Sequence, residues 1–361
     1  MVCKLCLKNE ANQKGSHIFT HALIKSAINQ PGKSGRDYEI SNKLSSNLDT
    51  QRYVGNSVLP ENLKDENGRE VPVVNSENGN YWVEDYLFCY SCEKRFTIAE
   101  NYFIENVYAK LKKNKFNSDL DEFGIQIAAF KSLNTSLLRL CIYIQFWRAS
   151  VSTKEDFKLR ENFEETLRQL INKNLLIDTK DTLNECKKNE QELNNFPLIV
   201  TFLQTDEVNL TENMIFAIPK TSEPYFISLG ELLFQLYEVG SEVQFEKNSF
   251  FGLNDFIKSN KHINVNKEFL KIGILNDEQR IYFRDNSMNH HVTERMEYQK
   301  LKVQNSFLQE FGKKLSDSES NHYCKLIFSD GFDLTTNNFD KEFINRFSKT
   351  VLLMHPSILR S

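Results

Sequence analysis

Residues 3–6 read CKLC and residues 89–96 read CYSCEKRF, so that two Cys-x-x-Cys pairs enclose the long segment between them. Two such pairs supply four thiolates, which is a complete tetrahedral set of ligands for structural zinc. We therefore expect Cys3, Cys6, Cys89 and Cys92 to hold one Zn²⁺. The alternative is a chance occurrence of two cysteine pairs without a metal.

The bulk properties of the chain limit the classes of protein to which it can belong. Its 361 residues are enough for two or three domains, and its net charge of −4 gives no overall basic surface of the kind that a DNA-coating protein needs. A nuclease is not excluded, because it needs only a local basic groove and a cation.

Cysteine usage and hydropathy bear on the compartment. The chain has seven cysteines, an odd number, which favours a reducing cytoplasm over a disulfide framework. No apolar leader follows Met1, and the apolar run at 133–147 is too short to cross a bilayer. We expect a cytoplasmic protein without a membrane partner.

The sequence predicts an α+β protein with a zinc-bound first domain, a helical second domain and a mixed α/β third domain, at residues 1–112, 113–192 and 193–361. A helix is predicted over 93–111, because Phe96, Phe103 and Val107 recur at helical spacing. The third domain carries no recognisable chemical motif, and we expect it to bind a protein partner or an activator.

Short apolar runs rich in β-branched and aromatic residues predict strands in the third domain, at 197–203, 214–219, 225–229 and 269–275. We expect 269–275 to pair with 279–283 across a turn at 276–278. Residues 324–328 and 332–335 flank a Ser-Asp-Gly sequence and are predicted to form a second hairpin.

Chemistry-bearing residues gather near the cysteine pairs. His17 lies shortly after the first pair, and histidine titrates in the range that suits a general base. Glu93 and Glu100 lie two turns apart on the apolar face of the predicted helix, where a carboxylate needs a partner. A cation or a histidine would serve; an ion pair of Glu100 with Arg139 or Arg148 is the structural alternative.

These elements resemble the HNH, or ββα-metal, nucleases of the treble-clef type. The resemblance is carried by Ser16-His17-Ile18, by the Cys-x-x-Cys-Glu sequence at 89–93, and by Trp147-Arg148-Ala149-Ser150. It covers residues 1–176. It implies a metal-dependent endonuclease that hydrolyses phosphodiester bonds of DNA, with RNA not excluded, and a role in bacterial antiphage defence.

The resemblance also implies roles for particular residues. His17 would be the general base, with His21 and Glu100 as further catalytic residues. Glu93, Asn101 and Ser16 would hold a catalytic Mg²⁺ or Mn²⁺. Ser16 departs from the family pattern, because the residue before the base is commonly a metal-binding Asp or His there.

Other interpretations of the same residues stay open. His17 could be a structural histidine bonded to a backbone carbonyl, and His21 could cap or pack a helix that begins near Thr20. At the level of the whole protein, the alternative is a zinc-stabilised module that binds nucleic acid or protein without catalysis, as a subunit of a defence complex.

Overall fold

The computed structural model describes residues 1–28, 40–44, 50–54, 82–120, 126–130, 132–153, 157–204, 215–217, 224–238, 270–328 and 339–355. They form a mixed α+β fold, as the sequence predicted. They divide into two compact units, one formed by residues up to Asn286 and the other by residues from Ser287 onward. Among the described helices, none is both long enough and apolar enough to span a membrane.

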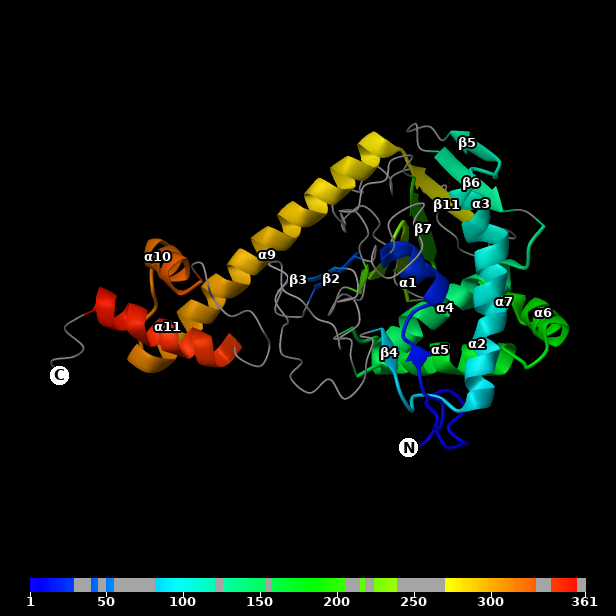
Figure 1. The fold of residues 1–361 in the computed structure, drawn as a ribbon, viewed down its shortest axis with the longest axis horizontal. Helices are drawn as coiled ribbons and strands as arrows, with labels where there is room; N and C mark the ends of the chain where they lie inside the picture. The colour runs from blue at the N-terminus through cyan, green and yellow to red at the C-terminus, as the bar shows by residue number, and fades with distance from the viewer. Residues whose placement is uncertain are drawn as a thin grey trace. The chain divides into compact units, whose positions relative to one another are not determined.

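The N-terminal part of the chain forms a strand pair (Figure 1). β1 (Ser16–His17) runs antiparallel to β4 (Val83–Glu84), with Ser16 opposite Glu84 and His17 opposite Val83. Between these strands the chain forms α1 (His21–Ile28) and the antiparallel pair of β2 (Ile40–Leu44) and β3 (Thr50–Val54). His17 therefore lies at the end of a strand, directly before α1.

A helix follows β4 and confirms the prediction over 93–111. It consists of α2 (Tyr90–Phe103), the π-helical turn η4 (Ile104–Tyr108) and α3 (Ala109–Lys112). The predicted apolar stripe of Phe96, Phe103 and Val107 is buried. Cys89 is the N-cap residue of α2, so that the second cysteine pair spans the start of this helix.

The helix at the centre of the first unit is α4 (Thr135–Val151). All of its residues from Thr135 to Ser150 are buried, and it packs against α2 and against α5 (Glu161–Asn174). Asn134 begins the helix by accepting a hydrogen bond from the Leu137 amide at 2.9 Å. A helix that is buried all round carries its polar side chains into the interior, where each needs a partner.

The described strands of the first unit also form a seven-stranded sheet in the order β5-β6-β11-β7-β10-β9-β8. β11 and β7 pair in parallel, and the other described pairs are antiparallel. The strands are β5 (Ser118–Leu120), β6 (Gln126–Phe130), β7 (Leu198–Leu203), β8 (Ile215–Ala217), β9 (Tyr225–Leu229), β10 (Leu232–Leu236) and β11 (Leu270–Leu275).

This sheet both confirms and corrects the sequence predictions. The strands predicted at 197–203, 225–229 and 269–275 are confirmed by β7, β9 and β11. The helical prediction for 113–192 is wrong for β5 and β6, because β6 pairs with β11, a strand far along the chain. The remainder of that segment is helical, with α6 (Thr179–Lys188) and α7 (Glu190–Leu193) after α5.

The later helices correct two predicted hairpins. Residues 279–283 belong to α9 (Asp277–Phe311), and residues 324–327 belong to α10 (Asp317–Ile327). Residues 332–335, the expected partner of 324–328, lie outside the described residues. α11 (Phe339–Met354) follows, and Phe307, Tyr323 and Phe347 contribute to the hydrophobic core of the second unit.

One hydrophobic core holds the first unit together. It includes residues from Cys3 to Ile274, and it takes side chains from α2, α4, α5 and the seven-stranded sheet. The core therefore continues across residues 112 and 192, where the sequence predicted domain boundaries.

Candidate metal centre and its surroundings

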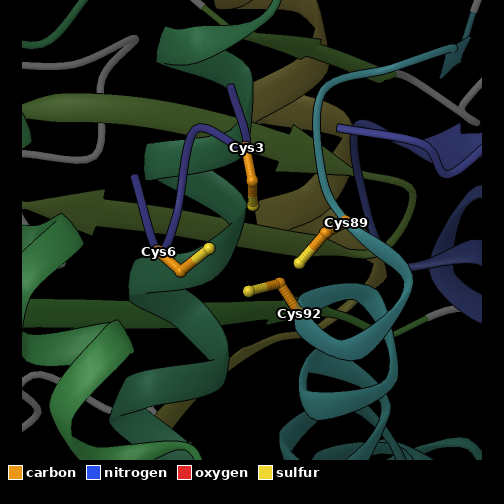
Figure 2. Close-up of side chains that lie close together, drawn as sticks. All are labelled: Cys3, Cys6, Cys89 and Cys92. Atoms are coloured by element: carbon orange, nitrogen blue, oxygen red, sulfur yellow. The ribbon is translucent and has the colours of Figure 1, made fainter. Parts of the chain in front are cut away.

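The four predicted cysteines come together at the start of α2. Cys3 and Cys6 lie on the N-terminal segment, Cys89 and Cys92 lie at the first turn of α2, and the four sulfurs point toward one another (Figure 2). All four lie within 4.8 Å of one another. A tetrahedral ion with metal–sulfur bonds of about 2.3 Å separates its sulfurs by roughly 3.8 Å, so this set could hold a metal ion after a small contraction.

Backbone hydrogen bonds shape the loop that presents the first pair. The amide of Lys4 donates to the carbonyl of Leu87 at 3.0 Å, which ties the N-terminal segment to the chain before α2. The Cys3 amide donates to Asn9 at 2.8 Å, and the Leu7 amide donates back to Cys3 at 3.0 Å. Leu7 takes a positive φ of 53°, which closes this tight turn.

The thiols interact strongly with one another. The hydrogen bond from Cys92 lowers the pKa of Cys3 to about 4, and the same contact together with burial raises the pKa of Cys92. Asn9 donates to the Cys89 sulfur and Arg95 donates to the Cys92 sulfur, each at 3.7 Å. A buried group of thiols with outer hydrogen-bond donors fits a thiolate-bound cation, because such donors stabilise negative sulfur.

His17 and His21 form a ring pair, with His17 on β1 and His21 at the first residue of α1. Their ring centroids lie 4.6 Å apart with the planes tilted by 40°. Burial, followed by the charges of His21 and Arg148, lowers the pKa of His17 from 6.5 to about 4. The His17 imidazole is therefore neutral at physiological pH and has a free electron pair for a proton.

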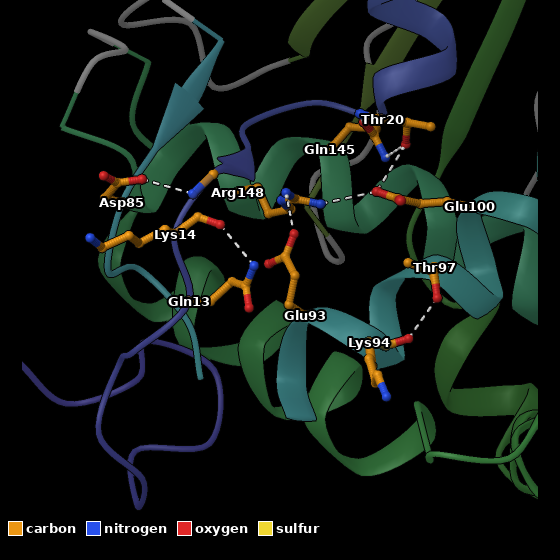
Figure 3. Close-up of polar contacts among 11 residues, drawn as sticks. Gln13, Lys14, Thr20, Asp85, Glu93, Lys94, Thr97, Glu100, Gln145 and Arg148 are labelled. Carbon is orange, nitrogen blue, oxygen red and sulfur yellow. Dashed lines mark hydrogen bonds and ion pairs between the residues drawn. The ribbon is translucent and has the colours of Figure 1, made fainter. Parts of the chain in front are cut away.

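Arg148 of α4 pairs with both carboxylates that the sequence placed on the inward face of the helix (Figure 3). Its guanidinium donates to Glu100 at 3.0 Å and to Glu93 at 3.4 Å. The same group lies 5.0 Å from the ring centroid of Phe96 and 5.6 Å from that of Phe88. The sequence left Arg139 and Arg148 open as ion-pair partners of Glu100, and in the structure the partner is Arg148.

Gln145 connects the histidine segment to α4, and sequence reasoning assigned it no role. Its side-chain oxygen accepts the Thr20 amide at 2.8 Å, and its side-chain nitrogen donates to the Thr20 hydroxyl at 2.8 Å (Figure 3). That hydroxyl donates onward to Glu100 at 3.2 Å. Burial raises the pKa of Glu100, and Arg148 opposes the rise. The one signal in the sequence was a glutamine inside the apolar run 133–147.

The other predicted ligands lie apart from one another. Ser16 is fully buried, and its hydroxyl has no hydrogen-bond partner among the described residues. Asn101 is exposed. Glu84, opposite Ser16, accepts hydrogen bonds from Ser152 at 2.6 Å and from the Thr153 hydroxyl at 2.7 Å, which holds the end of α4 against β4.

A catalytic Mg²⁺ or Mn²⁺ finds a poor set of ligands here. Glu93 and Glu100 are both engaged by Arg148, and Ser16 is an uncharged ligand away from solvent. Among the described residues, the four cysteines are the one group of three or more potential ligands that lie close enough to share an ion. The second cation stays a prediction.

Comparison with known proteins gives no relative for this chain. No family model, no curated protein and no solved structure matches it. The residues of the site are therefore the basis for any statement about function.

Proposed function

We propose that the first unit is an HNH-like phosphodiester hydrolase that acts on nucleic acid, with Zn²⁺ as its structural ion and His17 as its general base. The observation that carries the proposal is the position of His17, whose ring lies beside that of His21. His17 is a partly buried histidine at the end of a strand, with a pKa lowered to about 4. A general base must be unprotonated before it takes a proton from water, which the lowered pKa ensures, but it acts best when its pKa lies near the working pH, so the pKa of His17 would have to rise when the substrate binds.

The order of elements supports the same proposal. A cysteine pair precedes β1, β1 pairs with β4, and α2 follows β4 with the second cysteine pair at its start. This is the strand–strand–helix order that the resemblance to HNH nucleases implies. Zinc bound by the four thiolates would fix the N-terminal segment to α2, and so would fix the strand that carries His17.

The proposed step is the attack of water on phosphorus. Neutral His17 accepts a proton from the water as its oxygen bonds to phosphorus; the bond to the leaving oxygen breaks, and that oxygen takes a proton from solvent to leave as a hydroxyl. His21 is exposed and lies beside His17, so that it can hydrogen-bond a phosphate oxygen. Gln145 positions this pair, because it holds the Thr20 backbone between His17 and α1.

A second candidate function is a zinc-stabilised binding module without catalysis. Arg148 favours it, because its guanidinium already neutralises Glu93 and Glu100 and leaves them no need of a divalent cation. A module of this kind would keep the zinc and the surrounding surface and would have no use for a neutral His17.

Cleavage by purified full-length protein separates the two functions. Supercoiled plasmid, labelled single-stranded DNA and labelled RNA are incubated with the protein, with Mg²⁺, Mn²⁺ or neither added. The variants are His17→Ala, His21→Ala and, as the matched control, His322→Ala, which replaces an exposed histidine on α10. Zinc content is measured for every preparation.

We expect His17→Ala to lower the cleavage rate by about 10²–10⁴-fold with zinc unchanged, since that is the usual contribution of a general base. His322→Ala should cleave as the wild type does. Equal cleavage by the wild type and His17→Ala would refute the assignment of the base. No cleavage by any preparation that retains zinc would favour the binding module.

A further inference from the structure

Two tyrosines are exposed beside the cysteine cluster. Tyr86 lies between β4 and α2 with 39% of its surface exposed, and Tyr90 is the first residue of α2 with 57% exposed. Single exposed apolar side chains are ordinary on a protein surface, and what distinguishes these two is the cation that lies beside each ring. Neither ring is needed to complete the core of the first unit.

A lysine ammonium accompanies each of these rings. Lys14 Nζ lies 5.8 Å from the Tyr86 centroid, and Lys94 Nζ lies 4.5 Å from the Tyr90 centroid. The contact with Tyr86 raises the pKa of Lys14, so that this ammonium stays charged. The surface thus presents two tyrosine rings, each with a positive charge next to it.

The backbone holds both tyrosines against residues 12–14. The Tyr86 amide donates to the Gln13 carbonyl at 2.8 Å, and the Tyr90 amide donates to the Asn12 side chain at 3.1 Å. Tyr86 has a positive φ of 61°, a conformation that an aromatic residue rarely takes and that often marks functional positions. Both tyrosines are therefore tied through their backbone amides to Asn12 and Gln13.

The charges on this surface are unbalanced. Of its acids, Glu93 pairs with Arg148, whereas Glu84 and Asp85 keep their charge: Glu84 accepts from Ser152, Asp85 accepts the Gly15 amide at 2.7 Å, and the Asp85 carboxylate acts on Lys14. Exposed lysines remain at positions 4, 8, 14 and 94, with Glu10 as the exposed acid of the N-terminal segment. Four lysines thus accompany Glu10, Glu84 and Asp85 on this surface, so that cations are its most numerous charged groups.

We propose that Tyr86 and Tyr90, with Lys14 and Lys94, bind a single-stranded nucleic acid whose bases stack on the two rings. Exposed aromatic rings interleaved with cations suit unpaired bases on a phosphate backbone, whereas a duplex hides its base faces. Lys14 and Tyr86 lie at the end of the β1–β4 pair that also carries His17, so that a bound strand could continue to this histidine. That the bound strand is then cleaved rests on the proposed function. The inference adds that the substrate is single-stranded.

Binding is measured separately from cleavage, by fluorescence anisotropy with the full-length protein. The probes are a fluorescein-labelled twenty-nucleotide thymidine strand, a mixed-sequence duplex of the same length, and an acidic peptide of aspartates. All proteins carry His17→Ala, and Ca²⁺ replaces Mg²⁺, which prevents cleavage and leaves zinc in place. The variants are Tyr90→Ala and Tyr86→Asn, because asparagine tolerates a positive φ.

Conservative and distant substitutions provide the controls. Tyr86→Phe and Tyr90→Phe keep the ring, and Tyr282→Ala removes a tyrosine on α9 that is 60% exposed. We expect Tyr86→Asn and Tyr90→Ala each to weaken single-strand binding about tenfold, in the range that the loss of one stacked base gives. The phenylalanine variants and Tyr282→Ala should bind as the parent does.

Three results would overturn the inference: single-strand binding that Tyr86→Asn and Tyr90→Ala leave unchanged, duplex binding as tight as single-strand binding, or equal binding of the aspartate peptide. The first would mean that lysines alone bind the strand, and the last that the surface accepts any polyanion. If the strand binds as expected but the wild type never cleaves it, the proposed hydrolase fails and the binding site stands. If the wild type cleaves and the tyrosine variants bind normally, the proposed hydrolase stands and the tyrosine binding site fails.

Discussion

Replacement of Arg148 by methionine should be among the most destabilising single changes in the first unit. Methionine keeps the length and most of the packing of the side chain but removes the charge that Glu93 and Glu100 share. Arg148 is 1% exposed, and its two partners are 21% and 15% exposed. Loss of one member of a buried ion pair leaves the other charge without compensation and costs about 3–5 kcal/mol.

Two features of the structure place Arg148→Met in this range. The arginine makes two ion pairs, so its loss leaves two carboxylates uncompensated. Its contacts with the Phe88 and Phe96 rings add about 0.5–1 kcal/mol each when the cation is present. Glu100→Gln should cost far less, because the amide still accepts from Thr20 and Arg148, and burial already disfavours the carboxylate there.

Urea unfolding monitored by circular dichroism tests this prediction, with zinc content measured before each titration. The matched control is Lys173→Met, which breaks an ion pair with Glu192 in which both side chains are about half exposed. Such surface pairs contribute about 0–1 kcal/mol. The reasoning is refuted if Arg148→Met loses no more stability than Lys173→Met, since the buried pair would then have no greater value than an exposed one.

Further predictions concern the metal, a titration and a buried tyrosine. The purified protein should contain one zinc ion per chain and Cys92→Ser should lose it; a metal-free wild type, or a variant that keeps its zinc, would contradict the assignment. The pKa of His17 is about 4 in the folded protein and 6.5 in the unfolded chain, so the free energy of unfolding should fall as pH drops from 6.5 toward 4. His17→Gln should remove this part of the pH dependence, which urea midpoints measured across the same range will show. Identical pH curves for the two proteins would argue against the shift. Tyr108→Phe removes the hydroxyl that donates to buried Glu231 at 2.7 Å, and should lower the free energy of unfolding in urea by about 1–3 kcal/mol. A loss below about 0.5 kcal/mol would mean that this hydrogen bond does not stabilise the fold.

The parts of the fold that depend on local spacing were predictable. Two cysteine pairs have few uses besides a shared ion, and their sulfurs do converge. The helix from Tyr90 to Lys112 followed from apolar residues at helical spacing. The helix follows from the spacing of residues within one short segment, and the metal site follows from the chemistry of the cysteine thiols.

The errors came from long-range pairing and from missed helix starts. β6 is a strand because β11 pairs with it, and nothing near residue 126 announces that partner. The turn predicted at 276–278 is the start of α9, where Asn276 and Gln279 exchange side-chain hydrogen bonds with each other's backbone amides. Ser316 and Glu319 form the same kind of capping box before α10. These motifs were present in the sequence and outweigh the short β-prone runs beside them.

The candidate site was predictable as a set of residues more than as an arrangement. His17 and His21 do come together, although His17 lies on a strand and His21 begins a helix. Glu93 and Glu100 were correctly placed facing inward. That α4 would turn Arg148 toward both of them depends on packing between distant segments, which spacing alone does not determine.

The most direct test of the proposed hydrolase is the single-turnover rate of nucleic-acid cleavage by wild-type and His17→Ala protein at equal zinc content. The account predicts cleavage by the wild type and a rate at least about 100-fold lower for the variant, with one zinc ion in each. Equal rates would show that His17 is not the base, and the cleavage would then have to come from another part of the molecule.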